Sequence, residues 1–388
     1  MADTERVLRE LIEKIAEEQQ YRSSDAELQS FSTAGANYSS QLYRVTLHAP
    51  DKEDLVLFAK VLSISEHIRS QVPLTVFDIE KIFYSEILQR YREMEQKYNI
   101  PKQHRFSAIN YYGCSNEYMK EILVLEDLSS KGFRMHDRFE SFSWKYAAKA
   151  ITELAKFHAL SMAYDKIDPE FFSKFSAKFC IDEAREIVLK PMIENNIDMA
   201  GEVLTEENRE RLQAFRKKNL DRKFDYYYKP LKRAVLAHGD FRASNLMHRV
   251  REDGEIEIVM LDYQTINISN PIVDLMYFIF SGTDEEFRDK HYRQLLDHYH
   301  SELCASLRRL DVDPDVTYSK EDFESDLKEI QPFGIILSVM LVPIVTVYPE
   351  DAPSLESGNI TDFVAKPNDL AAKRLNGVIN DFVKLGVL

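Results

Sequence analysis

Strand-like patterns dominate the first third of the chain. Apolar residues at 41–48 and 54–62 flank a turn at 49–53 and predict a β-hairpin. Two further strands are predicted at 106–112 and 122–126. Ahead of them, apolar and charged residues alternate at helical spacing and predict a surface helix over 4–19. We therefore expect a strand-rich first part that begins with a helix.

The rest of the chain is mainly helical in pattern. Apolar residues recur at core spacing over 145–164, and His158 shares their face, where a lone histidine is most often a satisfied core residue. The mostly apolar run 333–345 is too short to span a bilayer and predicts a buried helix. Between these helices, apolar stretches at 235–237 and 256–261 predict two strands.

Within the strand predicted at 54–62, Lys60 is the only charged residue of the otherwise apolar run 55–62, and it lies on the face that carries Phe58. A buried charge is costly unless it is paired. The helix predicted at about 77–98 offers a partner, because Glu80 lies on its apolar face. The two residues predict a buried ion pair, as in kinases, where the lysine holds nucleotide phosphates. The alternative is a surface lysine and an unrelated glutamate.

The most specific pattern is His-Gly-Asp-Phe-Arg-Ala-Ser-Asn at 238–245, followed by Asp-Tyr-Gln at 262–264. Asp240, Asn245 and Asp262 have the spacing that metal-assisted phosphoryl transfer needs. One carboxylate orients the attacking hydroxyl, while the amide oxygen and the second carboxylate bind Mg²⁺ on the nucleotide phosphates. The alternative is that Asp240 and Asn245 only cap a helix or a turn.

Composition narrows the class of protein. The 388 residues are 44% hydrophobic and 30% charged, which suits a folded chain of two domains or lobes. A formal net charge of −15 argues against binding nucleic acid or an anionic membrane. The three cysteines are far apart and odd in number, so they indicate neither a zinc site nor a disulfide framework: Cys114, Cys180 and Cys304. The charged segment 1–20 lacks the apolar core of a signal peptide, and a cytoplasmic location is expected.

These motifs resemble the aminoglycoside phosphotransferase and choline kinase superfamily, and more narrowly the ecdysteroid kinase-like family of small-molecule kinases. The matching segments lie at 35–40, 77–84, 125–128, 154–161, 238–245 and 262–264. The resemblance implies an α+β, bilobal, protein-kinase-like fold. Residues 1–127 would form an N-lobe with an antiparallel sheet and a helix. Residues 128–388 would form a larger, mostly helical C-lobe, and the two lobes would make one catalytic unit.

The resemblance also implies roles for particular residues. Asp240 would be the catalytic aspartate, Asn245 and Asp262 the Mg²⁺ ligands, and Lys60, paired with Glu80, the residue that binds the phosphates of ATP. The loop at 35–40 would cover those phosphates through four residues: Gly35, Asn37, Ser39 and Ser40.

Three further interpretations come from the residues themselves. The segment from Glu126 to Leu128, ahead of 129–132, is a plausible hinge where adenine could bond backbone groups. Arg242 could neutralise the transferring phosphoryl group, or could hold Asp274 or another carboxylate structurally. Seven aromatic residues could line an acceptor pocket or pack in the core: Phe224, Tyr226, Tyr227, Tyr228, Tyr277, Phe278 and Phe280.

The activity that the resemblance implies is ATP- and Mg²⁺-dependent phosphorylation of a hydroxyl on a small molecule, either an ecdysteroid-like steroid or a xenobiotic. The chain departs from protein kinases, with one glycine in the 35–40 loop, Gln264 in place of the Gly of Asp-Phe-Gly, and no Ala-Pro-Glu segment. This disfavours a protein substrate. A nucleotide-binding pseudokinase or scaffold, and a choline- or aminoglycoside-type phosphotransferase, remain as alternatives.

Overall fold

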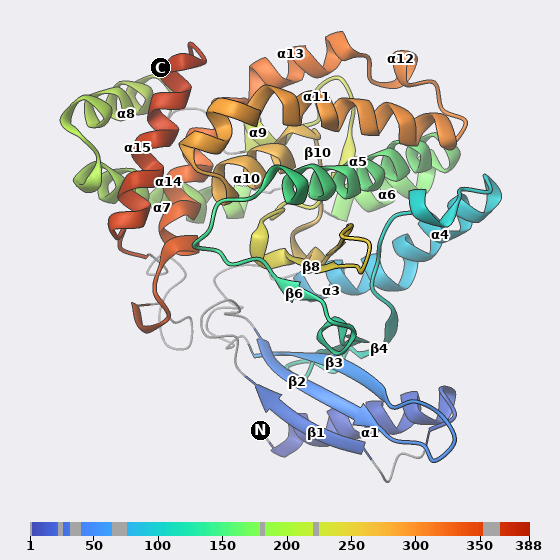
Figure 1. Ribbon diagram of the computed structural model, residues 1–388. Coiled ribbons are helices and arrows are strands. Elements are labelled where there is room, and N and C mark those ends of the chain that lie inside the picture. Colours follow the sequence, from blue (N-terminus) through green and yellow to red (C-terminus); the bar gives the residue numbers. More distant parts are fainter. Residues whose placement is uncertain are drawn as a thin grey trace.

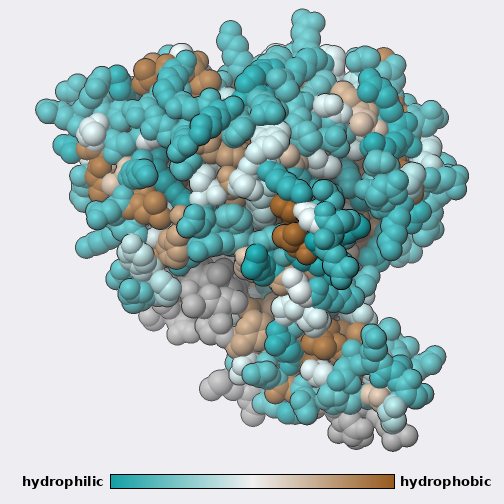
Figure 2. Space-filling model, in the orientation of Figure 1, coloured by the Kyte–Doolittle hydropathy of each residue, from teal (hydrophilic) through white to brown (hydrophobic). Residues whose placement is uncertain are grey.

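The computed structural model describes residues 2–21, 26–31, 40–63, 76–178, 183–219, 225–351 and 365–388. Figure 1 shows a smaller part, made of a sheet and the N-terminal helix, below a larger helical part. The predicted loop residues Gly35, Asn37 and Ser39 lie outside the described residues, as do Cys180 and Phe224. The face in Figure 2 is mostly hydrophilic, with small, separate hydrophobic patches.

In the described ranges, five strands form one antiparallel sheet in the order β1-β2-β3-β5-β4. Their bounds are β1 Ala26–Phe31, β2 Ser40–Leu47, β3 Leu55–Leu62, β4 Tyr111–Ser115 and β5 Ile122–Glu126. Helix α1, Ala2–Glu18, packs its apolar side against one face of this sheet, which carries Leu57, Ala59 and Val61. Residues of β3 alternate between faces, so Phe58 and Lys60 point to the opposite face, toward the helical part.

The helix that carries Glu80 is continuous from Val76 to Lys97 but contains one wide turn. It consists of α3, Val76–Ile82, a π-helical turn, Phe83–Ile87, and α4, Leu88–Lys97. Glu80 is buried, as its position on the apolar face predicts, and Glu86 is exposed.

Helices make up most of the remaining chain, with α5 buried along most of its length. Their bounds are α5 Trp144–Ile167, α6 Pro169–Lys178, α7 Glu183–Val203, α8 Glu206–Asn219, α9 Asp225–Tyr228, α10 Ile272–Gly282, α11 Glu285–Arg309, α12 Pro314–Thr317, α13 Lys320–Ile330, α14 Phe333–Thr346 and α15 Asp369–Lys384. Two small antiparallel sheets lie against α5. One is formed by β6 Arg134–Met135, β8 Leu246–Val250 and β9 Ile256–Met260, and the other by β7 Val235–Ala237 and β10 Asn267–Ser269. The predicted α+β fold class is confirmed.

One predicted strand is misplaced. The sequence predicts a strand over 106–112, whereas β4 spans Tyr111–Ser115. Backbone groups ahead of β4 bond to side chains instead of a strand: Phe106 N donates to Glu95 Oε1 at 2.6 Å, and Ser107 N donates to Glu153 Oε2 at 3.2 Å. These carboxylates come from α4 and α5, so local sequence could not reveal them.

The buried apolar helix predicted near 333–345 is α14, with most of its residues buried. Within the described part of the chain, no single helix is long and apolar enough to cross a membrane. Two consecutive helical segments, Pro314–Ile330 and Phe333–Thr346, are long and apolar enough only when counted together, and they meet at an angle of 60°.

Candidate active site

The loop after β7 is held by a buried carboxylate from α10. Asp274, which has no exposed surface, accepts hydrogen bonds from His238 N at 2.7 Å and Gly239 N at 2.9 Å. His158 Nε2 lies 3.0 Å from Asp274 Oδ2, and its Nδ1 lies 2.7 Å from Tyr299 Oη. His158 is therefore the satisfied core residue that the sequence predicts, and it also orients Asp274.

Asp240 is fixed by two neighbours on the same loop. Arg242 Nε donates to Asp240 Oδ1 at 2.8 Å, and Asn245 Nδ2 donates to Asp240 Oδ2 at 2.9 Å and to its carbonyl oxygen at 2.8 Å. Burial disfavours the charge of Arg242, but Asp240 outweighs this effect and raises the pKa of the guanidinium. The carboxylate that Arg242 holds is therefore that of Asp240, whereas the carboxylate of Asp274 accepts from the loop backbone.

Asp262 follows β9 in a left-handed conformation, with φ of 64°. Lys60 Nζ lies 2.6 Å from Asp262 Oδ1 and 2.9 Å from Glu80 Oε2, so the predicted ion pair of Lys60 and Glu80 is present and includes a third member. Gln264 joins the group more weakly, accepting from Lys60 Nζ at 3.4 Å and donating to Asp262 Oδ2 at 3.3 Å.

The charges of this group decide its protonation. Burial alone would lower the pKa of Lys60, but Asp262 and Glu80 outweigh it and raise that pKa. Burial opposes ionisation of both acids. Burial raises the pKa of Glu80. For Asp262, the positive charge of the nearby Lys60 outweighs the effect of burial and lowers the pKa. Asp262 is therefore an ionised oxygen donor at neutral pH.

One cavity of about 280 Å³ lies between the five-stranded sheet and the loops after β7 and β9, and Asp240 is held at its edge through Asn245. Its polar lining includes Lys60, Glu80, Asn245 and Asp262, and its apolar lining is Phe31, Leu42, Phe58, Ile109, Leu125, Leu128, Met135, Met247 and Leu261. Glu126 and Leu128 line the same cavity where β5 ends. Ser40, the last residue of the predicted 35–40 loop, begins β2 opposite Leu62.

Sequence reasoning missed the polar rim beside the predicted hinge. Arg44 Nε donates to Asp127 Oδ2 at 2.6 Å, its Nη2 donates to Ser129 Oγ at 2.6 Å, and all three residues line the cavity. Asp127 also caps the short 3₁₀ turn Leu128–Lys131 by accepting from Ser129 N at 2.8 Å. The Asp-x-Ser spacing at 127–129 is the sequence signal for such a cap.

The aromatic residues divide between the two predicted alternatives. Tyr227, Tyr228, Phe278 and Phe280 are buried in the core, whereas Tyr226 and Tyr277 are half-buried. Core packing therefore accounts for most of these aromatic residues. Of the two half-buried residues, Tyr277 lies on α10, the helix that also carries Asp274.

The oxygen donors suit a hard cation. Asn245 uses Nδ2 to hold Asp240, so its side-chain acceptor is Oδ1, and Asp262 adds an ionised carboxylate. Mg²⁺ usually takes one or two such ligands together with substrate phosphates and water. Within the described ranges, no three His, Cys, Asp or Glu side chains cluster as a metal site.

Comparison with known proteins defines the class. A catalytic-type loop, a lysine–glutamate pair and a second acid around one cavity belong to small-molecule phosphotransferases whose acceptor is an alcohol group. The model of the ecdysteroid kinase-like family matches residues 34–312, and the chain belongs to that family.

Solved structures show more distant likeness. The chain is 10% identical to aminoglycoside 2′-phosphotransferase-IIIa in its GDP complex, with 97% of each chain covered and a TM-score of 0.46. It is 13% identical to an aminoglycoside phosphotransferase in complex with GDP and kanamycin, covering 81% of this chain and 84% of that one, with a TM-score of 0.40. It is 12% identical to a glucosamine kinase, covering 98% of this chain and 84% of that one, with a TM-score of 0.38. No curated protein sequence matches the chain.

Proposed function

We propose that the protein transfers the γ-phosphoryl group of ATP, with Mg²⁺, to a hydroxyl of a small molecule. The observation that carries this proposal is that Lys60, Glu80, Asn245 and Asp262 line one cavity, with Asp240 bonded directly to Asn245. Residues 1–127 would act as the N-lobe and residues 128–388 as the C-lobe of one catalytic unit. The family and the cavity both support a nucleotide-dependent reaction.

In this mechanism Asp240 accepts a hydrogen bond from the acceptor hydroxyl and orients it toward the γ-phosphorus. The acceptor oxygen forms a bond to phosphorus, and the bond from phosphorus to the β,γ-bridging oxygen breaks. ADP leaves, and the hydroxyl proton passes to Asp240 and then to water. Arg242 and Asn245 each hold one carboxylate oxygen of Asp240, so its orientation is set before the acceptor arrives.

Around the nucleotide, Lys60 would exchange its bond to Asp262 for bonds to the α- and β-phosphates, while Glu80 keeps it in place. Asn245 and Asp262 would hold Mg²⁺, which when bound neutralises charge on the β- and γ-phosphates. The backbone between Glu126 and Leu128 would bind adenine. The loop residues Gly35, Asn37, Ser39 and Ser40 would cover the phosphates, as the family resemblance implies.

For the acceptor we propose an ecdysteroid-like steroid or a xenobiotic alcohol. The family name supports this class. We place the reaction in the cytosol, where the free cysteines Cys114 and Cys304 stay reduced.

The test is turnover with Mg²⁺ and ATP against ecdysteroids, plant phenols and glycosides, choline and aminoglycosides, with product identified by mass. Asp240→Asn should lower kcat by roughly 10²–10⁴ and leave ATP binding nearly unchanged. Asp253→Asn is the matched control, because Asp253 is an exposed acid bonded to Arg251 at 2.7 Å. Full turnover in Asp240→Asn would overturn the role of Asp240. Mg²⁺-dependent ATP binding without any product would favour the pseudokinase alternative.

A further inference from the structure

One face of α10 runs along the catalytic loop. Asp274, Tyr277 and Ser281 are spaced three and four residues apart and so share this face. At one end Asp274 binds the amides of residues 238 and 239. At the other end Ser281 lines the hollow that also contains Arg242 and Ser244. Tyr277 lies between these two contacts and therefore faces the stretch from Asp240 to Arg242.

Neighbouring rings fix this placement. Phe241, next to Asp240, packs against Phe278, next to Tyr277, with ring centroids 5.2 Å apart. Tyr228 Oη from α9 lies 2.8 Å from Tyr277 Oη, and Phe333 packs against both phenol rings, at 5.4 Å from Tyr228 and 6.5 Å from Tyr277. The Tyr277 hydroxyl is thus held in one position on a half-buried side chain.

The surrounding charges keep the Tyr277 hydroxyl protonated. Burial raises its pKa, and the carboxylates of Asp240 and Asp274 raise it further, against a smaller opposing effect of Arg242. Either hydroxyl can be the donor in the bond between the two phenols. When Tyr228 donates and Tyr277 accepts, the proton of Tyr277 can be donated elsewhere.

We propose that Tyr277, held by Tyr228, is an acceptor-binding residue that donates a hydrogen bond to an oxygen of the acceptor beside its reacting hydroxyl. The inference rests on the proposed function and adds a substrate class to it. An acceptor with two neighbouring oxygens, such as a diol or a hydroxyketone, satisfies Asp240 with one oxygen and Tyr277 with the other. An alcohol with a single oxygen satisfies Asp240 alone.

The test compares Tyr277→Phe with wild type on two acceptors: ecdysone, a polyhydroxylated steroid, and para-nitrophenol, whose hydroxyl has no neighbouring oxygen. Loss of one hydrogen bond should raise KM for ecdysone by roughly five- to thirtyfold. The kcat, KM for ATP and KM for para-nitrophenol should stay within about threefold of wild type. Tyr228→Phe, which removes the supporting donor, should give a smaller rise in KM for ecdysone.

The matched control is Tyr226→Phe, because Tyr226 belongs to the same aromatic run but its ring lies under Lys229 Nζ, at 3.9 Å. An unchanged KM for ecdysone in Tyr277→Phe, while Asp240→Asn is inactive, would overturn the inference and leave the proposed function standing. An equal loss of kcat on both acceptors would show that Tyr277 acts only on the geometry of Asp240. Turnover of para-nitrophenol alone by wild type would also overturn the inference. If calorimetry and turnover show neither binding nor phosphorylation of either acceptor by wild type, the proposed acceptor class fails as well.

Discussion

The group formed by Lys60, Glu80 and Asp262 contains two acids for one cation, all of them poorly exposed to solvent. Such an arrangement carries an excess negative charge when both acids are ionised, which is unfavourable without a counter-ion. The opposite pKa shifts of the two acids express this conflict, since the pKa of Glu80 is raised and that of Asp262 is lowered. A divalent cation on Asp262 would relieve the conflict, so the electrostatics of this group favour metal binding.

Gly239 illustrates how much a single position in the catalytic loop restricts substitution. Its φ is +78°, and a Cβ placed there would lie 2.3 Å from Thr265 O and 2.7 Å from Asn267 Nδ2. We predict that Gly239→Ala destabilises the protein by more than about 2 kcal/mol and abolishes turnover, because backbone cannot yield as a flexible side chain can. Denaturant unfolding and the acceptor assay measure the two effects.

Gly254 provides the control, because it has the same φ of +78° but no neighbouring atom within 4 Å of the position that a Cβ would take. Gly254→Ala should therefore cost only the left-handed backbone energy, about 1–2 kcal/mol. Equal losses in the two variants would show that the contact with Thr265 is not the limiting factor.

At the scale of elements, the sequence patterns predicted most of the helices and strands whose burial pattern is periodic. The hairpin β2–β3 and the helix that carries Glu80 follow the predicted alternation. The ion pair of Lys60 and Glu80 could also be predicted from the sequence, because each residue is a lone charge on an apolar face of its strand or helix. Strand β1 was not predicted, since its residues are mostly exposed and its pattern is set by pairing with β2. The predicted roles of the site residues stay predictions until turnover is measured.

Contacts that cross between distant elements were beyond local patterns. The position of Asp274 near the start of α10 would suit a helix cap as well as a brace for the catalytic loop, and only the folded chain decides between these by placing its carboxylate at two loop amides. The contact of Arg44 with Asp127 spans 83 residues and has no signal in the local sequence around either residue. Long-range polar contacts depend on how elements pack, which periodicity does not specify.

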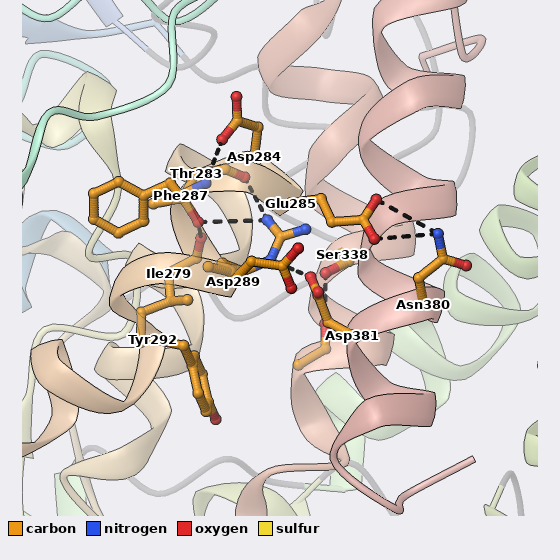
Figure 3. A network of polar contacts seen from close by, with 12 residues as sticks. Ile279, Thr283, Asp284, Glu285, Phe287, Asp289, Tyr292, Ser338, Asn380 and Asp381 are labelled. Atoms are coloured by element: carbon orange, nitrogen blue, oxygen red, sulfur yellow. Dashed lines mark hydrogen bonds and ion pairs between the residues drawn. The ribbon is translucent and has the colours of Figure 1, made fainter.

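Helices α11 and α15 are joined by a buried polar network, shown in Figure 3. Arg288, only 3% exposed, donates from Nε to Asp381 Oδ2 at 2.5 Å and from Nη1 to Thr283 O. Asp381→Ala would leave this guanidinium buried without its counter-ion, and we predict a loss of about 3–5 kcal/mol in unfolding free energy. Denaturant titration at neutral pH measures it.

Asp289 is the matched control for Asp381, because it lies on α11 and pairs with Lys384 at 2.6 Å but is half exposed. Asp289→Ala should cost less than about 1 kcal/mol, as for other exposed pairs. If Asp381→Ala costs no more than Asp289→Ala, then Thr283 and the packing around Arg288 suffice to hold α15.

Helices α11 and α13 share an exposed network with a predictable pH dependence. Arg293 Nη2 and Lys320 Nζ each lie 2.7 Å from Asp297 Oδ1. Hydrogen bonds from Arg293, helped by Lys320, lower the pKa of Asp297 from 3.8 to about 2. A lowered pKa means that the stabilisation is present above the unfolded value and is lost as pH falls from about 4 toward 2.

We therefore expect Asp297→Asn to lower the free energy of unfolding at pH 7 by less than about 1 kcal/mol, and to lower Tm slightly, because Asp297 is half exposed. The difference in Tm between wild type and this variant should shrink as pH falls from about 4 toward 2, because the unfolded wild type takes up a proton on Asp297 near pH 4 and the folded wild type only near pH 2. A difference that stays constant down to pH 3 would show that Asp297 does not titrate in the folded protein as its contacts require.

Across the whole molecule, the cavity is lined by residues from both the smaller and the larger part of the fold. The five-stranded sheet contributes Phe58 and Lys60, and the loops after β7 and β9 contribute Asn245 and Asp262. A nucleotide in this cavity would contact the smaller and the larger parts seen in Figure 1 at once. Any ligand that binds only the folded state raises its stability, by about 2.7 kcal/mol at one hundred times Kd.

The final prediction uses this linkage to test the metal ligand without turnover. The non-hydrolysable analogue AMP-PNP should raise the Tm of wild type, and Mg²⁺ should raise it further, because Asn245 and Asp262 would hold the cation against the phosphates. Asp262→Asn should keep much of the increase without Mg²⁺ and lose the additional, Mg²⁺-dependent increase. Asp253→Asn, on an exposed turn, should behave as wild type. If Mg²⁺ leaves the shift of wild type unchanged, Asp262 is not a metal ligand, and its bond to Lys60 is then a structural ion pair.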